Sequence, residues 1–596
     1  MNLKLKRMKE LFAYFIESVK KDGLLKTAYK VILFFKSRMK KRGRFLPAKA
    51  EIERQKAENL ESVCISIVTS LYNTPIVFLQ EYIQSVINQT YASWQLCLAD
   101  ASDENYSEAQ DIVESFNDTR IEYKRLSMNG GISANTNEAA KLAKGGYLCF
   151  ADHDDILAPN ALYEMAKAIK ETGAEFLYSD EALFTKSILK PSVGHFKPDY
   201  SPEYLRACNY MGHLVCVQKD LFWEVGALQP HMDGSQDHDF NLRVCEKATN
   251  INHIPKVLYY WRVHEQSTAG GAQAKPYAIQ AGVRAVQEHM NRIGAEAEVV
   301  AGDFGGTYRV RYAVKNNPLV SILIPNKDHA EDLKKLLTSL YEKTTYANFE
   351  VIVIENNSEE QETFAFYESL KIKYNNLKVV KFEGAFNFSA INNFGRKFAK
   401  GEFLLLLNND IEVITPEWLE DMLGYAMQGD VGIVGAKLLY SDNTVQHAGI
   451  IVGLGGYAGH NHKYFENGKS GYMFRLAVAQ NLSGVTAACL LVKATAFDEV
   501  GGMDEIFTVA YNDVDFCLRV REKGYLVVYT PYAQLYHYES KSRGLDTKGD
   551  AKYRFDAEKK LMKERYGVRL LQDPYYSPNL TLDAENFAEN PVFPKA

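Results

Sequence analysis

The sequence predicts an α/β protein with two tandem domains, and two observations support this prediction. First, a β-rich apolar segment followed by polar turn residues occurs twice, as CISIVTSLYNTP near residue 64 and as LVSILIPNKDHA near residue 319. Second, nearly continuous apolar strands alternate with helical patterns in both halves, which is typical of a mostly parallel sheet with helices on both faces. We therefore predict one domain at 61–300 and a second at 317–565.

The following elements occur in the same order in each half. WQLCLADASDE and FEVIVIENNSEE are strands that end in acidic and amide residues. GGISANTNEAAKLAKGGYLCFADHDD and FNFSAINNFGRKFAKGEFLLLLNND each predict a helix, a glycine turn and a strand that ends in acid. QDHDFNLRV and NDVDFCLRV each begin a helix with acidic residues, and YYWRVHEQST and QLYHYESKSRG place a histidine near the close of each half.

The spacing between equivalent residues is nearly constant along most of the repeat. Asp100 and Glu355 are 255 positions apart, and Asp154 and Asp410 are 256 apart. Asp237 and Asp513 are 276 apart, so the second copy gains about 20 residues around LGGYAGHNHK. We expect the loop 441–475 in this region to influence specificity.

Positive charge is concentrated at the start of the chain. Residues 1–46 contain fourteen Lys and Arg and three Asp and Glu, a charge of +11, so a net charge of -6 leaves -17 for the rest. We predict that 1–60 is a basic amphipathic helical segment that lies on an anionic membrane surface. The alternative is a solvated helix that packs on the rest of the protein. The acidic remainder argues against a nucleic-acid partner.

Other features bear on the compartment. The eight cysteines form no C-x-x-C motif, which argues against a disulfide scaffold or a structural zinc site and fits a reducing compartment. No uncharged apolar run is long enough for a membrane-spanning helix. We therefore expect a cytoplasmic protein at the inner face of the cell membrane. The tail 566–596 is expected to be an extended strap or partly disordered.

The acids at the strand ends predict a cation site. Asp152, Asp154 and Asp155 follow one apolar strand, and in the second copy Asn408 replaces the first acid and Asp410 remains. Mg²⁺ and Mn²⁺ prefer oxygen ligands and often bind one or two carboxylates together with substrate phosphates. A single aspartate after a strand is more often a turn or cap residue, but repetition of the whole pattern favours the functional interpretation.

Two further residue types are candidates for catalysis. Asp237 and Asp513 lie at predicted helix starts, where a carboxylate can act as a general base towards a hydroxyl. The alternative role is helix capping, which their neighbours Asp239 and Asp515 can also perform. The histidines of the closing segments, His264 and His537, are candidates for binding the cation or a diphosphate; a lone histidine is otherwise often structural.

The ordered motifs SLYNTP, LADASDE, NGGISANTN, FADHDD, GSQDHDFNLR and WRVHEQST resemble glycosyltransferase family 2, whose fold is called GT-A. The second half resembles the same family through IENNSEE, LLNNDIEV, VQHAGIIVG, GVTAACLLVK, YNDVDFCLR and HYESKSRG. The resemblance implies two GT-A domains that are inverting, metal-dependent and use nucleotide-diphosphate sugars. The chain departs from the common pattern at Gln236 and Asn512, where the family often has glutamate, and after the second strand, where it often has paired acids.

The resemblance also assigns roles to residues. It implies Asp237 and Asp513 as bases and Mg²⁺ or Mn²⁺ as the cofactor. The implied metal site consists of Asp154, His264, Asp410 and His537. The implied nucleotide-sugar site consists of Thr69, Tyr72, Asn73, Asp100, Asn135, Asp152, Pro325, Glu355, Asn393 and Asn408.

From this we expect a bifunctional glycosyltransferase of bacterial surface polysaccharide synthesis, similar to enzymes of rhamnose-rich polymers. The expected donor is dTDP-rhamnose or a UDP-hexose, and the expected acceptor is a lipid-linked glycan. One alternative is a single active domain with a second that only positions the acceptor, in which case Asn408 points to the second half as the silent one. Another alternative is a non-catalytic scaffold that binds nucleotides or glycans.

Overall fold

The computed structural model describes residues 43–58, 60, 63–264, 276–538 and 549–590. Most of the basic segment, 1–42, lies outside these residues, and with it the predicted membrane contact. The one helix described before the first sheet is α3 (Lys49–Ala57). Within the described ranges, every helix is too short or too polar to cross a bilayer.

The first sheet has the strand order β3-β2-β1-β4-β8-β6-β9-β5, and β7 pairs with β6. Strands β3, β2, β1 and β4 are parallel, and β8 joins β4 to β6 as an antiparallel neighbour of both. Its strands are β1 (Ile65–Leu71), β2 (Trp94–Asp100), β3 (Ile121–Arg125), β4 (Tyr147–Phe150), β5 (Ile156–Leu157), β6 (Phe176–Phe184), β7 (Val193–His195), β8 (Val215–Gln218) and β9 (Ile251–Arg262). Its helices are α4 (Ile76–Ile87), α5 (Glu108–Ser115), α6 (Ile132–Ala140), α7 (Ala161–Thr172), α8 (Pro202–Ala207), α9 (Lys219–Glu224), α10 (Gln236–Lys247) and α11 (Pro276–Arg292).

The second sheet repeats this topology as β14-β13-β12-β15-β22-β17-β23-β16, with β18 beside β17 and β21 beside β23. Its strands are β12 (Val320–Asn326), β13 (Phe349–Glu355), β14 (Leu377–Lys381), β15 (Phe403–Leu407), β16 (Ile411–Val413), β17 (Val431–Leu439), β18 (Val445–His447), β21 (Gln480–Asn481), β22 (Cys489–Lys493) and β23 (Leu526–His537). Its helices are α12 (Ala330–Lys343), α13 (Gln361–Lys373), α14 (Phe388–Arg396), α15 (Trp418–Ala426), α16 (Ala494–Glu499), α17 (Asn512–Glu522) and α18 (Gly549–Tyr566). The added residues of this half form a separate hairpin of β19 (Ile450–Val452) and β20 (Ala458–His460).

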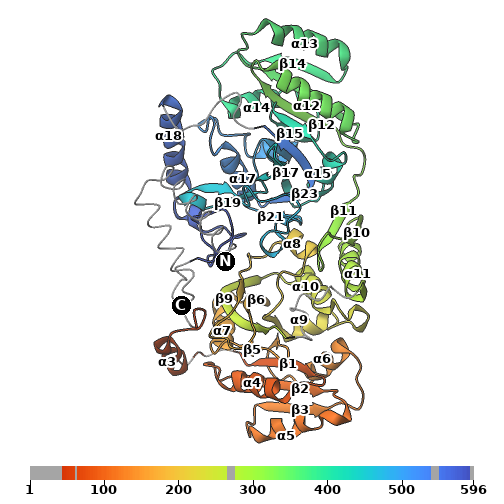
Figure 1. Ribbon diagram of the computed structural model, residues 1–596, viewed down its shortest axis with the longest axis vertical. Coiled ribbons are helices and arrows are strands. Elements are labelled where there is room, and N and C mark those ends of the chain that lie inside the picture. Colours follow the sequence, from red (N-terminus) through yellow and green to blue (C-terminus); the bar gives the residue numbers. More distant parts are fainter. Residues whose placement is uncertain (1–42, 59, 61–62, 265–275, 539–548, 591–596) are drawn as a thin grey trace, which may run out of the picture.

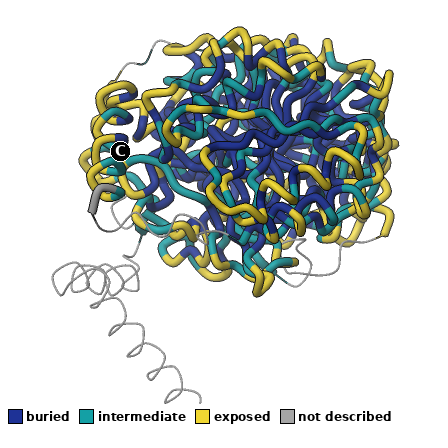
Figure 2. Tube along the Cα trace, turned by 90° about the horizontal axis from the view of Figure 1, so that it is seen from above, coloured by how far each residue is buried: buried dark blue, intermediate teal, exposed yellow. Residues whose placement is uncertain are grey.

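Burial explains why the central strands are so apolar. All five residues of β15 and six of the seven residues of β1 are buried, because helices cover both faces of each sheet. Figure 2 shows the buried segments in the interior and the exposed ones at the rim. The predicted α/β class with two tandem domains is confirmed, and the two sheets lie towards opposite ends of the long axis in Figure 1.

A hairpin of β10 (Ala297–Ala301) and β11 (Tyr308–Tyr312) lies between the two domains in the chain. Arg309 on this hairpin pairs with Asp421 of α15 at 2.6 Å. At the domain interface, Asn481 on β21 accepts hydrogen bonds from the Ser201 hydroxyl and the Glu203 backbone N–H, both at 3.0 Å. The two domains therefore share a hydrogen-bonded contact as well as a covalent linker.

The described part of the tail contacts both domains. Asp573 accepts hydrogen bonds from the Val452 backbone N–H at 2.7 Å and the Ser483 hydroxyl at 2.6 Å in the second domain. Asn579 donates to the Asp180 carboxylate at 2.8 Å in the first domain. Phe587 is buried beside residues of both domains. The tail therefore acts as a strap.

We expect Phe587→Ala to lower the free energy of unfolding by about 3–5 kcal/mol, the usual cost of removing a buried phenylalanine ring. The ring stacks on His462 at 4.5 Å and on Tyr472 at 5.5 Å. Chemical denaturation should detect the loss. Ile372→Ala is the matched control, because Ile372 is 89% exposed, and we expect it to change stability by less than about 0.5 kcal/mol. Equal effects of the two variants would contradict the strap.

Candidate active sites

In the first domain, the acids after β4 divide into accessible and buried groups. Asp154 Oδ2 is 2.8 Å from His264 Nε2, which follows β9. Asp152 is more exposed, and its Oδ2 is 3.5 Å from His213 Nε2. Asp155 is fully buried and accepts hydrogen bonds from the Tyr259 hydroxyl and the Arg262 backbone N–H, both at 2.6 Å. The predicted partners Asp154 and His264 are therefore adjacent, and Asp155 holds the strand ends together.

Asp237 is the second residue of α10; its side chain is accessible to solvent, but the protein atoms packed around it limit its hydration. Desolvation by the surrounding protein raises the pKa of Asp237; the nearby His213 imidazole opposes this rise and the Asp152 carboxylate adds to it. His213 also stacks on Tyr259, with ring centroids 4.7 Å apart. His213 is therefore close to Asp152 and within electrostatic range of Asp237. That Asp237 shares an active site with the acids after β4 stays a prediction.

The residues predicted to contact the nucleoside in the first domain differ in their exposure to solvent. Thr69 is buried and its hydroxyl donates to the Ala151 carbonyl at 2.8 Å, so it joins β1 to the segment after β4. Tyr72 is exposed, and the Asn73 amide donates to Asp103 Oδ2 at 2.7 Å. These two residues lie on the surface at the carboxyl end of β1. Their role in nucleoside binding stays a prediction.

Two further residues of the predicted nucleotide-sugar site, Asp100 and Asn135, form hydrogen bonds with other residues of the first domain. Asp100 is buried and accepts hydrogen bonds from the Tyr123 hydroxyl at 2.7 Å and from Arg125 at 2.6 Å. Burial would raise the pKa of Asp100, but the hydrogen bonds from Ser102, Tyr123 and Arg125 outweigh it and lower the pKa. Asn135 accepts from the Gly130 backbone N–H at 3.1 Å and so shapes the turn before α6.

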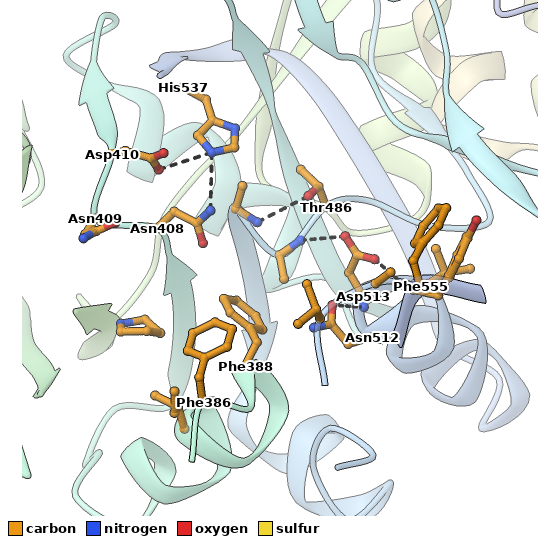
Figure 3. A pocket seen from close by; sticks show the side chains of 18 of the residues that line it. Phe386, Phe388, Asn408, Asn409, Asp410, Thr486, Asn512, Asp513, His537 and Phe555 are labelled. Carbon is orange, nitrogen blue, oxygen red and sulfur yellow. Dashed lines mark hydrogen bonds and ion pairs between the residues drawn. The ribbon is translucent and has the colours of Figure 1, made fainter. Parts of the chain in front are cut away.

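The second domain has a cavity of about 730 Å³ at the carboxyl ends of its strands. Five of the predicted residues line it: Pro325, Asn408, Asp410, Asp513 and His537. Figure 3 shows Asp410 and His537 on one side of the pocket and Asp513 on the other. Phe386, Phe388, Tyr511 and Phe555 add aromatic surface. Asp410 and Asp513 therefore border one shared pocket.

His537 ends β23 and is oriented by its neighbours. Its Nδ1 lies 2.8 Å from Gln446 Oε1, which can only accept, so Nδ1 carries a proton. Its Nε2 lies 3.2 Å from Asp410 Oδ1 and 3.3 Å from the Asn408 amide nitrogen. Such a hydrogen bond to the second ring nitrogen is the usual way a metal-binding histidine is fixed.

Asp513 is the second residue of α17, like Asp237 in α10. Its oxygens accept hydrogen bonds from the Ala487 backbone N–H at 3.3 Å and the Val514 backbone N–H at 2.8 Å. Burial raises the pKa of Asp513, and these two hydrogen bonds offset part of the rise. The helix start thus holds a carboxylate at the cavity wall that binds a proton more readily than an ordinary aspartate.

Two predicted residues of the second domain do not line this cavity. Glu355 is buried, and its carboxylate accepts from the Ser358 and Tyr367 hydroxyls, both at 2.6 Å. Asn393 bonds the backbone of Met503 through both amide atoms, at 2.8 and 2.9 Å. Asn356, next to Glu355, lines the pocket instead. In this structure Glu355 and Asn393 support the walls of the site.

The residues fit a divalent cation in part. Over the described residues, no cluster of three or more His, Cys, Asp or Glu is arranged to hold a metal. Each domain does, however, bring one carboxylate and one imidazole nitrogen together, in Asp154–His264 and Asp410–His537. Mn²⁺ accepts both ligand types, and the phosphates of a substrate and water can supply the remaining ligands.

Three histidines that the sequence motifs did not single out lie at these sites. His213 lies beside Asp152 in the first domain. His460 lines the cavity of the second domain, and the buried His447 is hydrogen-bonded to it. His447 and His460 fall in VQHAGIIVG and GHNHK, so the histidine-rich insertion was the available signal. His213 stands just before a strand and gave no such signal.

Two parts of the chain match the model of Glycosyl transferase family 2, residues 66–180 and 321–501. Both regions belong to that family. The predicted family is therefore confirmed for both halves of this glycosyltransferase family 2 chain. The matched regions carry the acids at the ends of β4 and β15, while Asp237, Asp513 and the two closing histidines lie beyond them.

The chain is also similar to longer bacterial proteins. It is 40% identical over 530 residues to the uncharacterized protein y4gI of Sinorhizobium fredii, covering 88% of this chain and 58% of the relative. It is 37% identical over 525 residues to the O-antigen biosynthesis protein RfbC of Myxococcus xanthus, covering 87% and 40%. The chain thus spans about half the length of these relatives. A structure of S. aureus TarS 1-349 with UDP-GlcNAc aligns at 18% identity and a TM-score of 0.33, covering 38% of this chain and 66% of that TarS fragment.

Proposed function

We propose that this chain is a bifunctional inverting glycosyltransferase that moves sugars from nucleotide-diphosphate donors to a growing cell-surface glycan. One observation carries the proposal: Asp513 and the Asp410–His537 pair border the same 730 Å³ cavity. The first domain supports it with the equivalent residues Asp237, Asp154 and His264. The similarity to a protein named for O-antigen biosynthesis supports the glycan class.

In this proposal each residue has a separate task. Asp513 or Asp237 accepts the proton of the acceptor hydroxyl while that oxygen attacks the anomeric carbon. The carboxylate–imidazole pair of each site orients the diphosphate on the opposite side of the sugar. A divalent cation held by that pair would neutralise the departing diphosphate. The displacement inverts the anomeric centre because attack and departure occur on opposite faces.

The proposal also covers the sugar donor, the acceptor and the place in the cell where the chain acts. We infer dTDP-rhamnose or a UDP-hexose as donor and a lipid-linked glycan as acceptor. A membrane-bound acceptor would match the concentration of positive charge in residues 1–46. These assignments are tested by supplying each donor with lipid-linked acceptor to the whole chain.

The decisive experiment measures Mn²⁺-dependent turnover of a panel of nucleotide sugars. The proteins are the unaltered chain, Asp237→Asn, Asp513→Asn and the double variant. We expect each single variant to lose one activity and the double variant to lose both. If one of the two single variants loses turnover of every nucleotide sugar, the result would favour one active domain and one silent domain. Donor binding without turnover by the unaltered chain would favour a scaffold.

We expect His213→Ala to move the acid limb of first-site activity to higher pH. The His213 imidazole lowers the pKa of Asp237, so its removal lets that pKa rise. A base with a higher pKa is protonated, and inactive, up to a higher pH. A pH–rate profile in the Asp513→Asn background measures the first site alone, and an unshifted limb would contradict the assignment.

A further inference from the structure

Helix α18 bears a buried carboxylate that holds the loop before the proposed base of the second site. Glu558 of this helix is only 2% exposed. Its Oε1 accepts hydrogen bonds from the Thr508 backbone N–H at 2.7 Å, the Thr508 hydroxyl at 2.8 Å and the Val509 backbone N–H at 2.9 Å. Its Oε2 accepts from the Ala510 backbone N–H at 3.0 Å. One side chain therefore fixes three consecutive residues of the loop.

The three residues held in this way lead directly to the base. Val509 and Ala510 line the cavity, and Asp513 follows three positions after Ala510, as the second residue of α17. Figure 3 shows Asp513 and Phe555, a residue of α18, on the same side of the pocket. The position of the loop therefore decides where α17 begins and where the Asp513 carboxylate lies.

The backbone between the loop and α17 is in an unfavourable conformation. Tyr511 has a φ of 60°, in the left-handed region that a bulky residue rarely adopts. Such a conformation persists only where surrounding contacts enforce it. Glu558 fixes Ala510 on one side, and on the other side the Tyr511 carbonyl accepts from the Asp515 backbone N–H at 2.9 Å. In the loop before α10, the residue with positive φ is Gly234, which adopts it without steric cost.

Helix α18 also holds the chain after the base. Arg565 pairs with Asp515 Oδ1 at 2.5 Å, and the Tyr566 hydroxyl donates to the same oxygen at 2.7 Å. Asp515 is two positions after Asp513 on α17. The helix therefore fixes the chain on both sides of the base, at the loop before it and at the first turn that contains it.

The first domain holds its base loop with different chemistry. Its helix α11 follows β9 as α18 follows β23. Arg284 of α11 donates to the His231 carbonyl in the loop before α10, at 3.0 Å. Arg292 of α11 approaches Asp239 Oδ1 at 4.0 Å, where Arg565 is in contact with Asp515. An arginine thus serves the first loop, and a buried carboxylate serves the second.

We propose that Glu558 is a positioning residue of the second site, which holds residues 508–510 so that the Asp513 carboxylate stays at the cavity wall. The inference rests on the proposed function, in which Asp513 accepts the proton of the acceptor hydroxyl. A general base must lie within hydrogen-bonding reach of that hydroxyl. A displacement of about 1 Å can lower the rate about a hundred-fold. Glu558 acts through the loop and not on the substrate.

The test compares Glu558→Gln with the unaltered residue in the Asp237→Asn background, where turnover reports the second site. Glutamine has nearly the same shape but only one accepting atom, so at least one loop N–H loses its acceptor. With UDP-glucose, UDP-N-acetylglucosamine or dTDP-rhamnose as donor, we expect kcat to fall about ten- to a hundred-fold. The dissociation constant of the nucleotide sugar should not change, because the Asp410–His537 pair lies on the other side of the pocket.

Two further variants control for general damage to the helix. Glu564→Gln makes the same chemical change at an exposed position of α18, where Glu564 pairs with Lys560 at 3.6 Å, and should keep kcat unchanged. Thr508→Val removes only the side-chain hydrogen bond to Glu558 and should lower kcat by about two-fold. It tests the loop even if the Glu558→Gln protein unfolds, which circular dichroism would show.

A double-mutant cycle separates positioning of the base from general support of the fold. In protein that already contains Asp513→Asn, Glu558→Gln should cause no further loss of the residual transfer, because the base that it positions is absent. An equal fold-loss with and without Asp513 would overturn the inference. A kcat equal to that of Glu564→Gln, or weaker donor binding in step with kcat, would overturn it as well. Absence of turnover by the Asp237→Asn protein with Glu558 intact would instead remove the proposed function and this inference with it.

Discussion

Asp513→Asn should reduce sugar transfer at the second site by about 10²–10⁴-fold, the usual contribution of a general base. The amide is close to the carboxylate in size but cannot accept the proton of the attacking hydroxyl. Asp237→Asn should do the same at the first site. Steady-state transfer with each donor measures the loss, and equilibrium binding of the donor should change little because the cation pair is untouched.

The pH dependence of this site follows from the same carboxylate. Burial raises the pKa of Asp513, so the base stays protonated to a higher pH than an exposed aspartate, and the acid limb of kcat/KM moves upwards accordingly. Because the folded-state pKa is above the unfolded value, the carboxyl stabilises the fold below the unfolded pKa. That contribution is lost as the pH rises through the folded pKa.

This linkage supplies a control against misfolding. At pH 7 the buried charge costs stability, and asparagine removes it while giving up one of the two backbone hydrogen bonds. We expect the free energy of unfolding of Asp513→Asn to stay within about 1 kcal/mol of the unaltered chain. A variant that loses transfer together with donor binding, or that unfolds, would remove the base assignment.

The fold was predictable because both copies keep the same order of hydrophobic strands and polar strand ends. A parallel sheet gathers its carboxyl ends at one edge, so acids that follow different strands meet there. That rule placed the strand-end residues Asp410 beside His537 and Asp154 beside His264. Asp513 reaches the same cavity from the start of helix α17. It carries no information about antiparallel strands such as β8, which enter the sheet from a distant part of the chain.

The same rule gives the end of a strand but not the direction of a side chain. Glu355 and Asn393 come from the expected elements, yet protein partners occupy their polar atoms. His213 and His460 reach the sites through loops and a hairpin, whose shapes depend on long-range contacts. A periodic sequence pattern does not contain such contacts. The histidine-rich insertion pointed to the region of His460 but not to its position at the cavity, and His213 could be found only from coordinates.

Removal of divalent cations should lower transfer at both sites by about three orders of magnitude. Several kcal/mol of stabilisation of the leaving diphosphate would be lost, and each 1.36 kcal/mol is worth a factor of ten. Dialysis against a chelator, followed by titration with Mn²⁺ or Mg²⁺, measures the loss and its recovery. Asp410→Asn should weaken Mn²⁺ binding at the second site in the presence of nucleoside diphosphate, as seen by electron paramagnetic resonance.

Mn²⁺ binding can be compared between the two domains, because each has one carboxylate–imidazole pair. Asp154→Asn should remove one of two bound Mn²⁺ ions and Asp410→Asn the other, because each acid has its own imidazole partner. Asn408 in place of the Asp152 carboxylate leaves the second pair with less negative charge, so its Mn²⁺ should bind more weakly than that of the first. Full turnover after complete chelation would contradict a cation role for the pairs in both domains. The Asp237→Asn protein reports the second site alone. If turnover survives chelation only in that protein, the cation role of Asp410–His537 alone would be contradicted.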